Sequence, residues 1–422
     1  MKNIINKIIN NEYAFSVFSK VLGVFTGVCY SVLYSRYLQA TFRGEASVIT
    51  TYVDLGTLIF CFGVYQGYPH FRKKKETKLY KEYINLIFGF IVLYIILGLF
   101  FICIVRPVIS VCTIVMMLPL SIGIKELNYV VMIENPISIN KTSIVLSVMD
   151  NVIVIIFMLA VEVDYIACIL LLVIKEVVYF AFAIKRLDIN FLTIRPTLNG
   201  ASRYIRFGFL PMLTVLMMEI NYKADVLLLE WLNINKADIG VYTLGVSLAQ
   251  RIWMIPDAMK DILLSKLAKG KNKDEVCKVT RINIFIVAIF SMFLAIVGRL
   301  IIELLYGEEY SEAYTIILTL LVGIFGMIFY KSVYSYNVIQ GDRWKNFIFL
   351  GVAASVNVFL DVFLIPEIGI WGAAIASTLS YSICGLFFLN DFCKKTTTGY
   401  YEMIFITKRD ILSITKLLGI KR

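Results

Sequence analysis

The chain has 422 residues, of which 59% are hydrophobic and only 17% are charged. A soluble globular protein has about 25% charged residues, so this composition excludes an ordinary soluble domain and favours a chain that lies mostly in lipid. The formal net charge is +11, there is a single histidine, and the eight cysteines form no CxxC pair. Histidine-based metal sites and catalytic triads are therefore not expected.

Long apolar segments recur along the whole sequence, each long enough to cross about 30 Å of hydrocarbon as a helix. The first is too long for the apolar part of a signal peptide, so we interpret it as a span. The fold class expected is an all-α polytopic membrane protein. The pattern predicts about twelve transmembrane helices, at residues 13–35, 46–68, 83–105, 108–134, 142–161, 165–184, 207–232, 239–262, 282–305, 313–338, 345–365 and 370–391.

Basic residues in the short loops predict which side of the membrane each loop faces. When the N-terminus is placed in the cytoplasm, the inner segments hold 30 of the 41 lysines and arginines, and the outer loops hold 4. The remaining 7 lie within predicted spans. This bias predicts that both termini are cytoplasmic.

A polar break at 185–206 separates six predicted spans from another six, as in transporters built from two repeats. We predict an N-terminal six-helix lobe at 1–190, a cytoplasmic linker at 191–206, a C-terminal six-helix lobe at 207–395 and a cytoplasmic tail at 396–422. The tail mixes basic residues with helically spaced apolar ones, which is typical of an amphipathic helix on the membrane surface.

Four charged residues interrupt the span at 207–232: Glu219, Lys223, Asp225 and Glu230. Each charge at the bilayer centre costs about 2.5–3.5 kcal/mol. Glu219 and Lys223 are four residues apart and can pair on one helix face, whereas Asp225 lies elsewhere on the helix and needs another partner. Structural ion pairs or a polar, water-accessible cavity between helices can explain such charges, and the set of seven cations within spans favours the cavity.

Cations that line a cavity select anions, and phosphate groups bind lysine and arginine through charge-assisted hydrogen bonds. The candidate substrate-binding residues are Lys20, Lys175, Lys223, Arg251 and Lys331. The candidate charge-pairing or coupling residues are Asp54, Glu219 and Asp225.

The segment 351–385, GVAASVNVFLDVFLIPEIGIWGAAIASTLSYSICG, carries Asn357, Asp361, Pro366 and a Gly-Ile-x-Gly-Ala-Ala-Ile-Ala run. This pattern resembles a signature of the polysaccharide-exporter branch of the MOP superfamily, with Ser377 where threonine is common. Further matches in the same order extend the resemblance over most of the chain, although Lys223 stands where arginine is usual. The chain is similar to Wzx-type flippases of lipid-linked oligosaccharides and, more distantly, to MATE exporters and the lipid II flippase MurJ.

The resemblance implies two MATE-like six-helix lobes in which spans one, two, seven and eight line a central cavity. Lys20, Lys223 and Arg251 would then lie on lining helices, whereas Lys175 would not. It also implies a multi-pass protein of the bacterial cytoplasmic membrane that moves undecaprenyl-diphosphate-linked oligosaccharide repeat units by alternating access, for capsule, O-antigen or exopolysaccharide synthesis. The expected partners are this lipid-linked oligosaccharide, membrane lipid and a polysaccharide polymerase, with no cofactor and no nucleic acid.

Other function classes remain open at this point. A MATE-like exporter of small cations, driven by Na⁺ or H⁺, would bind its coupling ion at Asp54, Asp150 or Asp225. A membrane transferase or polymerase is disfavoured, because the outer loops are short and neither a DxD sugar-nucleotide motif nor a GxxxxGK nucleotide-binding motif occurs. A structural scaffold would leave the charges within spans unexplained. We therefore expect a transporter rather than an enzyme.

Overall fold

A computed structural model of the protein describes residues 12–72, 77–187, 189, 193–270, 273–407 and 410. These residues form helices joined by short connections, and no strand occurs among them. The chain divides into two compact units, Met1–Leu216 and Met217–Arg422. The division falls within helix α8 and lies C-terminal to the linker expected at 191–206, and the domain limits derived from the sequence stay a prediction.

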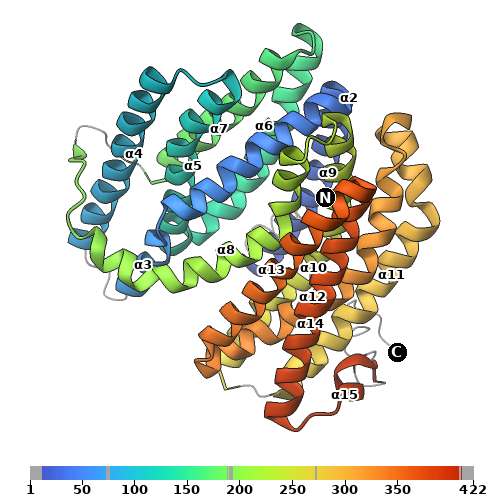
Figure 1. Ribbon diagram of the computed structural model, residues 1–422. Coiled ribbons are helices and arrows are strands. Elements are labelled where there is room, and N and C mark those ends of the chain that lie inside the picture. The colour runs from blue at the N-terminus through green and yellow to red at the C-terminus, as the bar shows by residue number, and fades with distance from the viewer. Residues whose placement is uncertain are drawn as a thin grey trace, which may run out of the picture. The chain divides into compact units, whose positions relative to one another are not determined.

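The described helices of the first unit pack around α5, which contacts α2, α4 and α7, while α2 also packs along α6. Within α2, Gln39 has a non-helical backbone (φ 57°, ψ 176°), so two helices follow one another there. They correspond to the first two predicted spans. The helices labelled in Figure 1 are α2 (Glu12–Phe60), α3 (Val64–Phe71), α4 (Thr77–Val105), α5 (Ile109–Glu134), α6 (Pro136–Ala160), α7 (Tyr165–Arg186) and the first half of α8 (Ala201–Trp231).

The described helices of the second unit pack around α12, which lies against α14, while α14 also packs along α13. α12 also contacts α9, α10 and α11. The elements of this unit, beyond the second half of α8, are α9 (Lys236–Gln250), η3 (Arg251–Trp253), α10 (Met254–Ala268), α11 (Lys273–Leu305), η4 (Glu308–Tyr310), α12 (Ala313–Gln340), α13 (Arg343–Ile368), α14 (Ile370–Thr396) and α15 (Tyr400–Ile404).

Every predicted span coincides with a helix or with consecutive helices, which confirms an all-α polytopic membrane protein. Among the described residues, eight helices are long and apolar enough to cross a membrane, and the bent pair Phe25–Phe60 and Val64–Phe71 makes a ninth. Helix α8 is not among them, because its charged and amide residues lower its hydropathy. Neither are α9 and α10, which have 15 residues each and so reach only about 22 Å. The expected span at 239–262 is thus two half-helices.

The bend between α2 and α3 depends on two glycines. The two helices meet at an angle of 50°. Gly63 at the bend has φ +74°, and a Cβ there would lie 2.2 Å from the carbonyl oxygen of Gly208 in α8. Only glycine fits a left-handed backbone this close to another helix. The bend therefore packs the backbone at Gly63 directly against α8.

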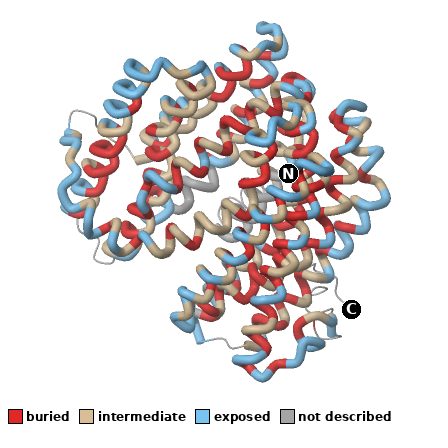
Figure 2. The backbone as a smooth tube through the Cα atoms, in the orientation of Figure 1, coloured by how far each residue is buried: buried red, intermediate tan, exposed pale blue. Residues whose placement is uncertain are grey.

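Tyrosines fill the interior of the first unit at the level of α3 and α4. The ring of Tyr83 lies 4.5 Å from that of Tyr68 and 5.0 Å from that of Tyr204, measured between centroids. Their hydroxyls reach carboxylates, since Tyr83 donates to Glu126 and Tyr68 donates to Glu134. Buried polar groups in lipid need such partners. Red segments in Figure 2 mark the buried residues along these helices.

Helices α12 and α14 approach so closely that their backbones touch. A Cβ on Gly326 would lie 2.5 Å from the carbonyl oxygen of Tyr381, and one on Gly385 would lie 2.2 Å from that of Gly326. Small residues permit such contacts between membrane helices, where dispersion forces rather than the hydrophobic effect hold helices together.

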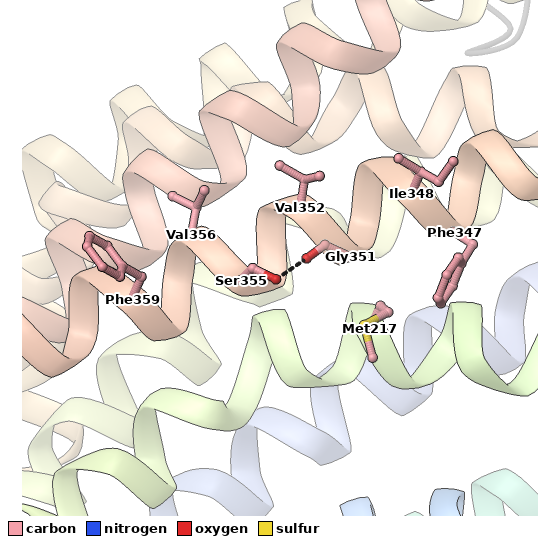
Figure 3. Close-up of a pocket in the computed structure, with 8 residues that line it drawn as sticks. All are labelled: Met217, Phe347, Ile348, Gly351, Val352, Ser355, Val356 and Phe359. Carbon is pink, nitrogen blue, oxygen red and sulfur yellow. Dashed lines mark hydrogen bonds between the residues drawn. The ribbon is translucent and has the colours of Figure 1, made fainter.

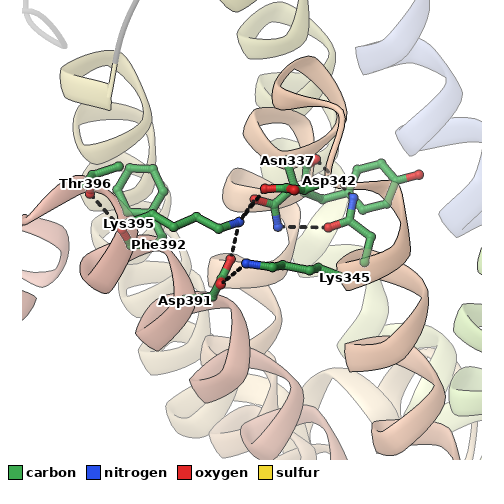
Figure 4. A network of polar contacts seen from close by, with 9 residues as sticks. Asn337, Asp342, Lys345, Asp391, Phe392, Lys395 and Thr396 are labelled. Carbon is green, nitrogen blue, oxygen red and sulfur yellow. Dashed lines mark hydrogen bonds and ion pairs between the residues drawn. The ribbon is translucent and has the colours of Figure 1, made fainter.

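At one end of this helix pair, a network of polar side chains connects the helices (Figure 4). Lys395 Nζ lies 2.6 Å from Asp391 Oδ2 and 2.7 Å from Asp342 Oδ2, and Lys345 Nζ donates to Asp391 at 3.0 Å. The hydrogen bond from Lys395 lowers the pKa of Asp342. A network of several charges fixes the positions of its side chains better than an isolated ion pair on the surface does. The network therefore links the ends of α12, α13 and α14.

The described part of the C-terminal tail docks on α11. Arg281 donates from Nε to Asp410 Oδ2 at 2.7 Å, and a second nitrogen reaches Asp410 Oδ1 at 3.1 Å. Burial opposes ionisation of Asp410, but the hydrogen bonds from Arg281 and Thr407 outweigh it and lower the pKa of Asp410 to about 2. The ion pair is thus fully formed at neutral pH. The rest of the predicted amphipathic tail, 411–422, lies outside the described residues.

We expect Gly385→Val to destabilise the second unit. The added side chain meets backbone atoms of α12 that cannot move aside, and overpacking of this kind costs about 1–3 kcal/mol or more. In a thermal melt followed by size-exclusion chromatography in detergent, the variant should melt several degrees below the wild type.

Gly23→Val is the matched control, because a Cβ on Gly23 meets nothing within 4 Å. Equal melting temperatures for Gly385→Val and the wild type would contradict the close contact between α12 and α14.

Candidate functional site

In the first unit, Lys175 of α7 lies among tyrosines and one carboxylate. Its Nζ is 3.5 Å from Asp150 Oδ2 of α6 and 3.4 Å from the hydroxyl of Tyr30 of α2. The hydroxyl of Tyr179 donates to the same Asp150 at 2.7 Å. Asp150 therefore neutralises Lys175, and the tyrosines supply further hydrogen bonds. To bind an anionic substrate, Lys175 would have to exchange Asp150 for it.

Two more candidates of the first unit lie on α2. Lys20 belongs to this helix, but its side chain lies outside the described residues. Asp54 is exposed and lies within electrostatic range of Glu176 of α7. Glu176 itself accepts a hydrogen bond from Ser121.

In the second unit, the expected pair on α8 is present. Lys223 Nζ lies 3.1 Å from Glu219 Oε2, and the two side chains are 33% and 24% exposed. Such partial exposure means that neither charge is sealed in the protein interior. Because the four-residue spacing places both groups on one face, α8 carries a charged stripe in the middle of a predicted span. The sequence predicted this pair correctly.

Arg251 lies at the break between the two half-helices α9 and α10. It begins the 3₁₀ turn η3 and is partly buried. The rings of Trp253, Tyr222 and Tyr381 pack beside this break, with centroids 5.3–5.7 Å apart. Gln250, Arg251, Trp253 and Met254 keep right-handed helical dihedrals, so the break is a local tightening of the helix into a 3₁₀ turn. Pro256 follows in the first turn of α10, where a proline costs no hydrogen bond within the helix.

Lys331 of α12 holds that break in place. Its Nζ donates to Asp257 Oδ1 of α10 at 2.5 Å and lies 4.8 Å from the ring centre of Trp253. The side chain of Lys331 is only 6% exposed, whereas that of Asp257 is 52% exposed. The pair is therefore asymmetric, with a buried cation and a hydrated anion.

Asp225 of α8 is buried and is paired with hydroxyl groups. The hydroxyl of Tyr242 donates to Asp225 Oδ2, and Ser377 Oγ donates to the same oxygen at 3.2 Å. Its other oxygen accepts from the backbone N–H of Val226. Among the described residues, no cation partners Asp225. The structure thus separates Asp225 from the Glu219–Lys223 pair on the same helix.

A second buried carboxylate, Asp361 of α13, lies within electrostatic range of Asp225. Asp361 is 0% exposed, and neither of its oxygens has a hydrogen-bond partner among the described residues. One turn earlier, Asn357 donates to Ser377 Oγ at 3.3 Å, while its Oδ1 also lacks a partner there. A buried carboxylate without donors is too costly to stay charged alone, so a proton or a cation must neutralise it.

Asp225 was predicted from the sequence as a charge-pairing or coupling residue, whereas its neighbour Asp361 was not predicted as a site. In the sequence, Asn357, Asp361 and Ser377 stand out only as parts of a family-like signature. The four-residue spacing of Asn357 and Asp361 on one face of an apolar helix was the signal available. No group of three or more His, Cys, Asp or Glu side chains suited to a metal ion occurs in the described part of the chain.

The family model described as "Polysaccharide biosynthesis protein" matches residues 33–315. No curated protein shows significant sequence similarity to the chain.

Solved structures share the fold at low sequence identity. The lipid II flippase MurJ in an inward closed conformation aligns with a TM-score of 0.73 at 14% identity, covering 97% of this chain and 93% of MurJ. A multidrug resistance MATE family transporter of the MOP superfamily aligns in its inward-facing form with a TM-score of 0.60 at 14% identity, covering 91% of this chain and 96% of the transporter. In the outward-facing form the TM-score is 0.55, at 13% identity, covering 92% and 97%. These similarities show that the chain shares its fold with MurJ and with MATE transporters, as expected from the sequence.

The asymmetry of the Lys331–Asp257 pair predicts unequal effects of removing its two members. Asp257→Asn leaves a buried cation without its counter-charge and should cost about 3 kcal/mol or more. Lys331→Met removes the buried charge and leaves Asp257 hydrated, so it should change stability by less than about 1.5 kcal/mol.

Thermal melts of the two variants in detergent test this expectation, with the wild type as reference. A larger loss in Lys331→Met than in Asp257→Asn would mean that the carboxylate, and not the lysine, depends on the pair.

Proposed function

Since this chain belongs to the polysaccharide biosynthesis protein family, we propose that it is a flippase for undecaprenyl-diphosphate-linked oligosaccharide repeat units in a bacterial cytoplasmic membrane. Such a protein moves its substrate from the cytoplasmic to the outer leaflet by alternating access. The observation that carries the proposal is the partly exposed Glu219–Lys223 pair in the middle of a predicted span, since these charges suit a polar path through the membrane.

The physical problem for such a substrate is its headgroup. A glycan and a diphosphate cannot cross about 30 Å of hydrocarbon without losing their hydrogen bonds with water. A polar path replaces those hydrogen bonds, while the polyprenyl tail stays in lipid. The proposed protein is thus a transporter, because moving the substrate along such a path requires no covalent chemistry.

Cationic side chains would hold the diphosphate on this path. Lys223 and Arg251 are the best placed of the described candidates, because Lys223 is partly exposed and Arg251 lies at a helix break. Glu219 would hold Lys223 when the substrate is absent and release it when the diphosphate binds. Lys20 remains a candidate from the sequence. Lys175 and Lys331 are weaker candidates, because each would have to leave Asp150 or Asp257.

The buried pair Asp225 and Asp361 would couple transport to an ion. Carboxylate, amide and hydroxyl oxygens are ligands that hard cations prefer, and Asp361 and Asn357 both offer oxygens without partners. Binding of Na⁺ or of a proton would neutralise the pair and change how α8 packs against α13 and α14. The same cluster favours the alternative function, a MATE-like exporter of small cations driven by Na⁺ or H⁺. Asp54 is a further coupling candidate, since it is exposed on α2.

Lys223→Gln should lower flippase activity about 10- to 100-fold, because one charge-assisted hydrogen bond to the diphosphate is lost. The measurement is complementation of a flippase-null strain at matched expression, scoring surface polysaccharide and the lipid-linked repeat units that accumulate inside.

Lys236→Gln is the matched control, because Lys236 also pairs with a carboxylate, Glu230, but lies in a predicted outer loop. Full activity of Lys223→Gln would mean that its charge is structural. If the wild type fails to complement with several repeat-unit types but confers resistance to toxic cations, the exporter function replaces the flippase.

The proposed coupling site predicts an ion-dependent stability. In NaCl at 100 times its dissociation constant, a bound Na⁺ should stabilise the wild type by about 2.7 kcal/mol relative to choline chloride of equal ionic strength. Asp361→Asn should abolish this difference, whereas Glu303→Gln, which removes a surface carboxylate of the same unit, should keep it.

If protons are the coupling ion, the wild type should instead melt at a lower temperature as the pH rises, because Asp361 must then ionise in a buried position, and this decrease should be smaller in Asp361→Asn. A wild type whose melting temperature responds to neither Na⁺ nor pH would contradict the coupling role.

A further inference from the structure

An apolar groove runs along α13 in the second unit. It has a volume of about 680 Å³ and is lined by Met217 of α8 and by seven residues of α13. Ser355 is the one lining residue with a polar side-chain group, and its hydroxyl donates to the carbonyl of Gly351 on its own helix at 2.9 Å. The groove therefore offers hydrocarbon contacts and no free hydrogen-bonding group among its lining side chains.

The lining residues of α13 form two parallel rows along the helix (Figure 3). One row is Phe347, Gly351, Ser355 and Phe359, and the other contains Ile348, Val352 and Val356. In the first row, two small residues lie between two phenylalanines, so the helix surface is hollowed in its middle. A Cβ on Gly351 would meet only the Met217 side chain, at 3.9 Å. From Phe347 to Phe359 the hollow extends about 18 Å.

The end of the groove nearest the helix start is cationic and aromatic. Arg343 is exposed, and no described carboxylate forms an ion pair with it. Trp344 is 62% exposed, as is typical of a side chain at the membrane interface. The neighbouring Lys345 is held by Asp391. An anionic headgroup at Arg343 would thus place its hydrocarbon chain at the start of the hollow.

Building on the proposed function, we propose that this groove binds the polyprenyl tail of the lipid-linked substrate, with the diphosphate near Arg343 when the substrate enters. A polyprenyl chain carries a methyl branch on every isoprene unit, and its double bonds restrict rotation. It therefore loses less conformational entropy than a saturated acyl chain when it is ordered in a shaped groove. Its branches can fill the hollow at Gly351, and the flexible Met217 side chain can adjust to them.

The groove also explains how a long tail can accompany a moving headgroup. Loops around 339–345 are predicted to be cytoplasmic, so Arg343 marks the leaflet in which the substrate is made. A tail held in this groove keeps the diphosphate close to the charged residues of α8, because Met217 of α8 also lines the groove. Several isoprene units fit along the hollow, and the rest of the tail remains in the bilayer.

The test is native mass spectrometry of the purified full-length protein with undecaprenyl diphosphate or with phosphatidylglycerol. Gly351→Leu fills the hollow and should weaken undecaprenyl diphosphate binding about tenfold, the effect of losing burial of roughly two methylene groups. Binding of phosphatidylglycerol should not change. Val322→Leu is the control, since it places a leucine at an exposed position of α12 that does not line the groove.

Each outcome decides one proposal. If Gly351→Leu binds undecaprenyl diphosphate as the wild type does, or if phosphatidylglycerol displaces it equally well, the groove holds ordinary bilayer lipid and the inference fails. If Gly351→Leu loses tail binding but the wild type does not complement a flippase-null strain, the groove stands and the proposed flippase function fails. If Gly351→Leu melts at the same temperature as the wild type, its loss of binding is not caused by misfolding.

Discussion

Hydrocarbon offers no hydrogen-bond partner, so each polar or charged group placed in the membrane must find its partner within the protein or in water that the protein admits. This constraint explains why the described backbone is helical and why its exceptions are few. It also explains the tyrosine–carboxylate contacts in the interior of the first unit, where Tyr83 donates to Glu126. Polar or charged groups without such a partner point to function, because a ligand or a functional role must offset the free energy of burying them.

The charged residues of the spans satisfy this constraint in three different ways. Lys331 and Lys175 have a carboxylate of a neighbouring helix, which stabilises the packing of their own unit. Glu219 and Lys223 pair with each other and stay partly exposed, which suits a path for a polar headgroup. Asp361 has no partner among the described residues, which suits a site for a proton or a cation. The charged residues within the spans thus fall into three groups, of which one stabilises packing, one suits transport and one suits ion coupling.

The proposed function and the tail groove divide the substrate by polarity. The headgroup would meet the charged stripe of α8, and the tail would meet the apolar rows of α13. Both helices belong to the second unit from Met217 onward, and Met217 itself lies beside Gly351. A single compact unit would then hold both ends of an amphipathic substrate, which limits how far the two ends can separate during transport.

The sequence alone determined the fold class, the order of the spans and the pairing of Glu219 with Lys223. Hydrophobic length and helical periodicity are local properties, and they follow directly from the chemistry of the bilayer. Local patterns do not reveal the break at Arg251, because it depends on Trp253, Tyr222 and Tyr381, which come from three separate segments. The partners of Lys175 and Lys331, the isolation of Asp361 and the hollow at Gly351 likewise depend on which helix faces which. Those contacts are long-range, so only the tertiary structure decided them.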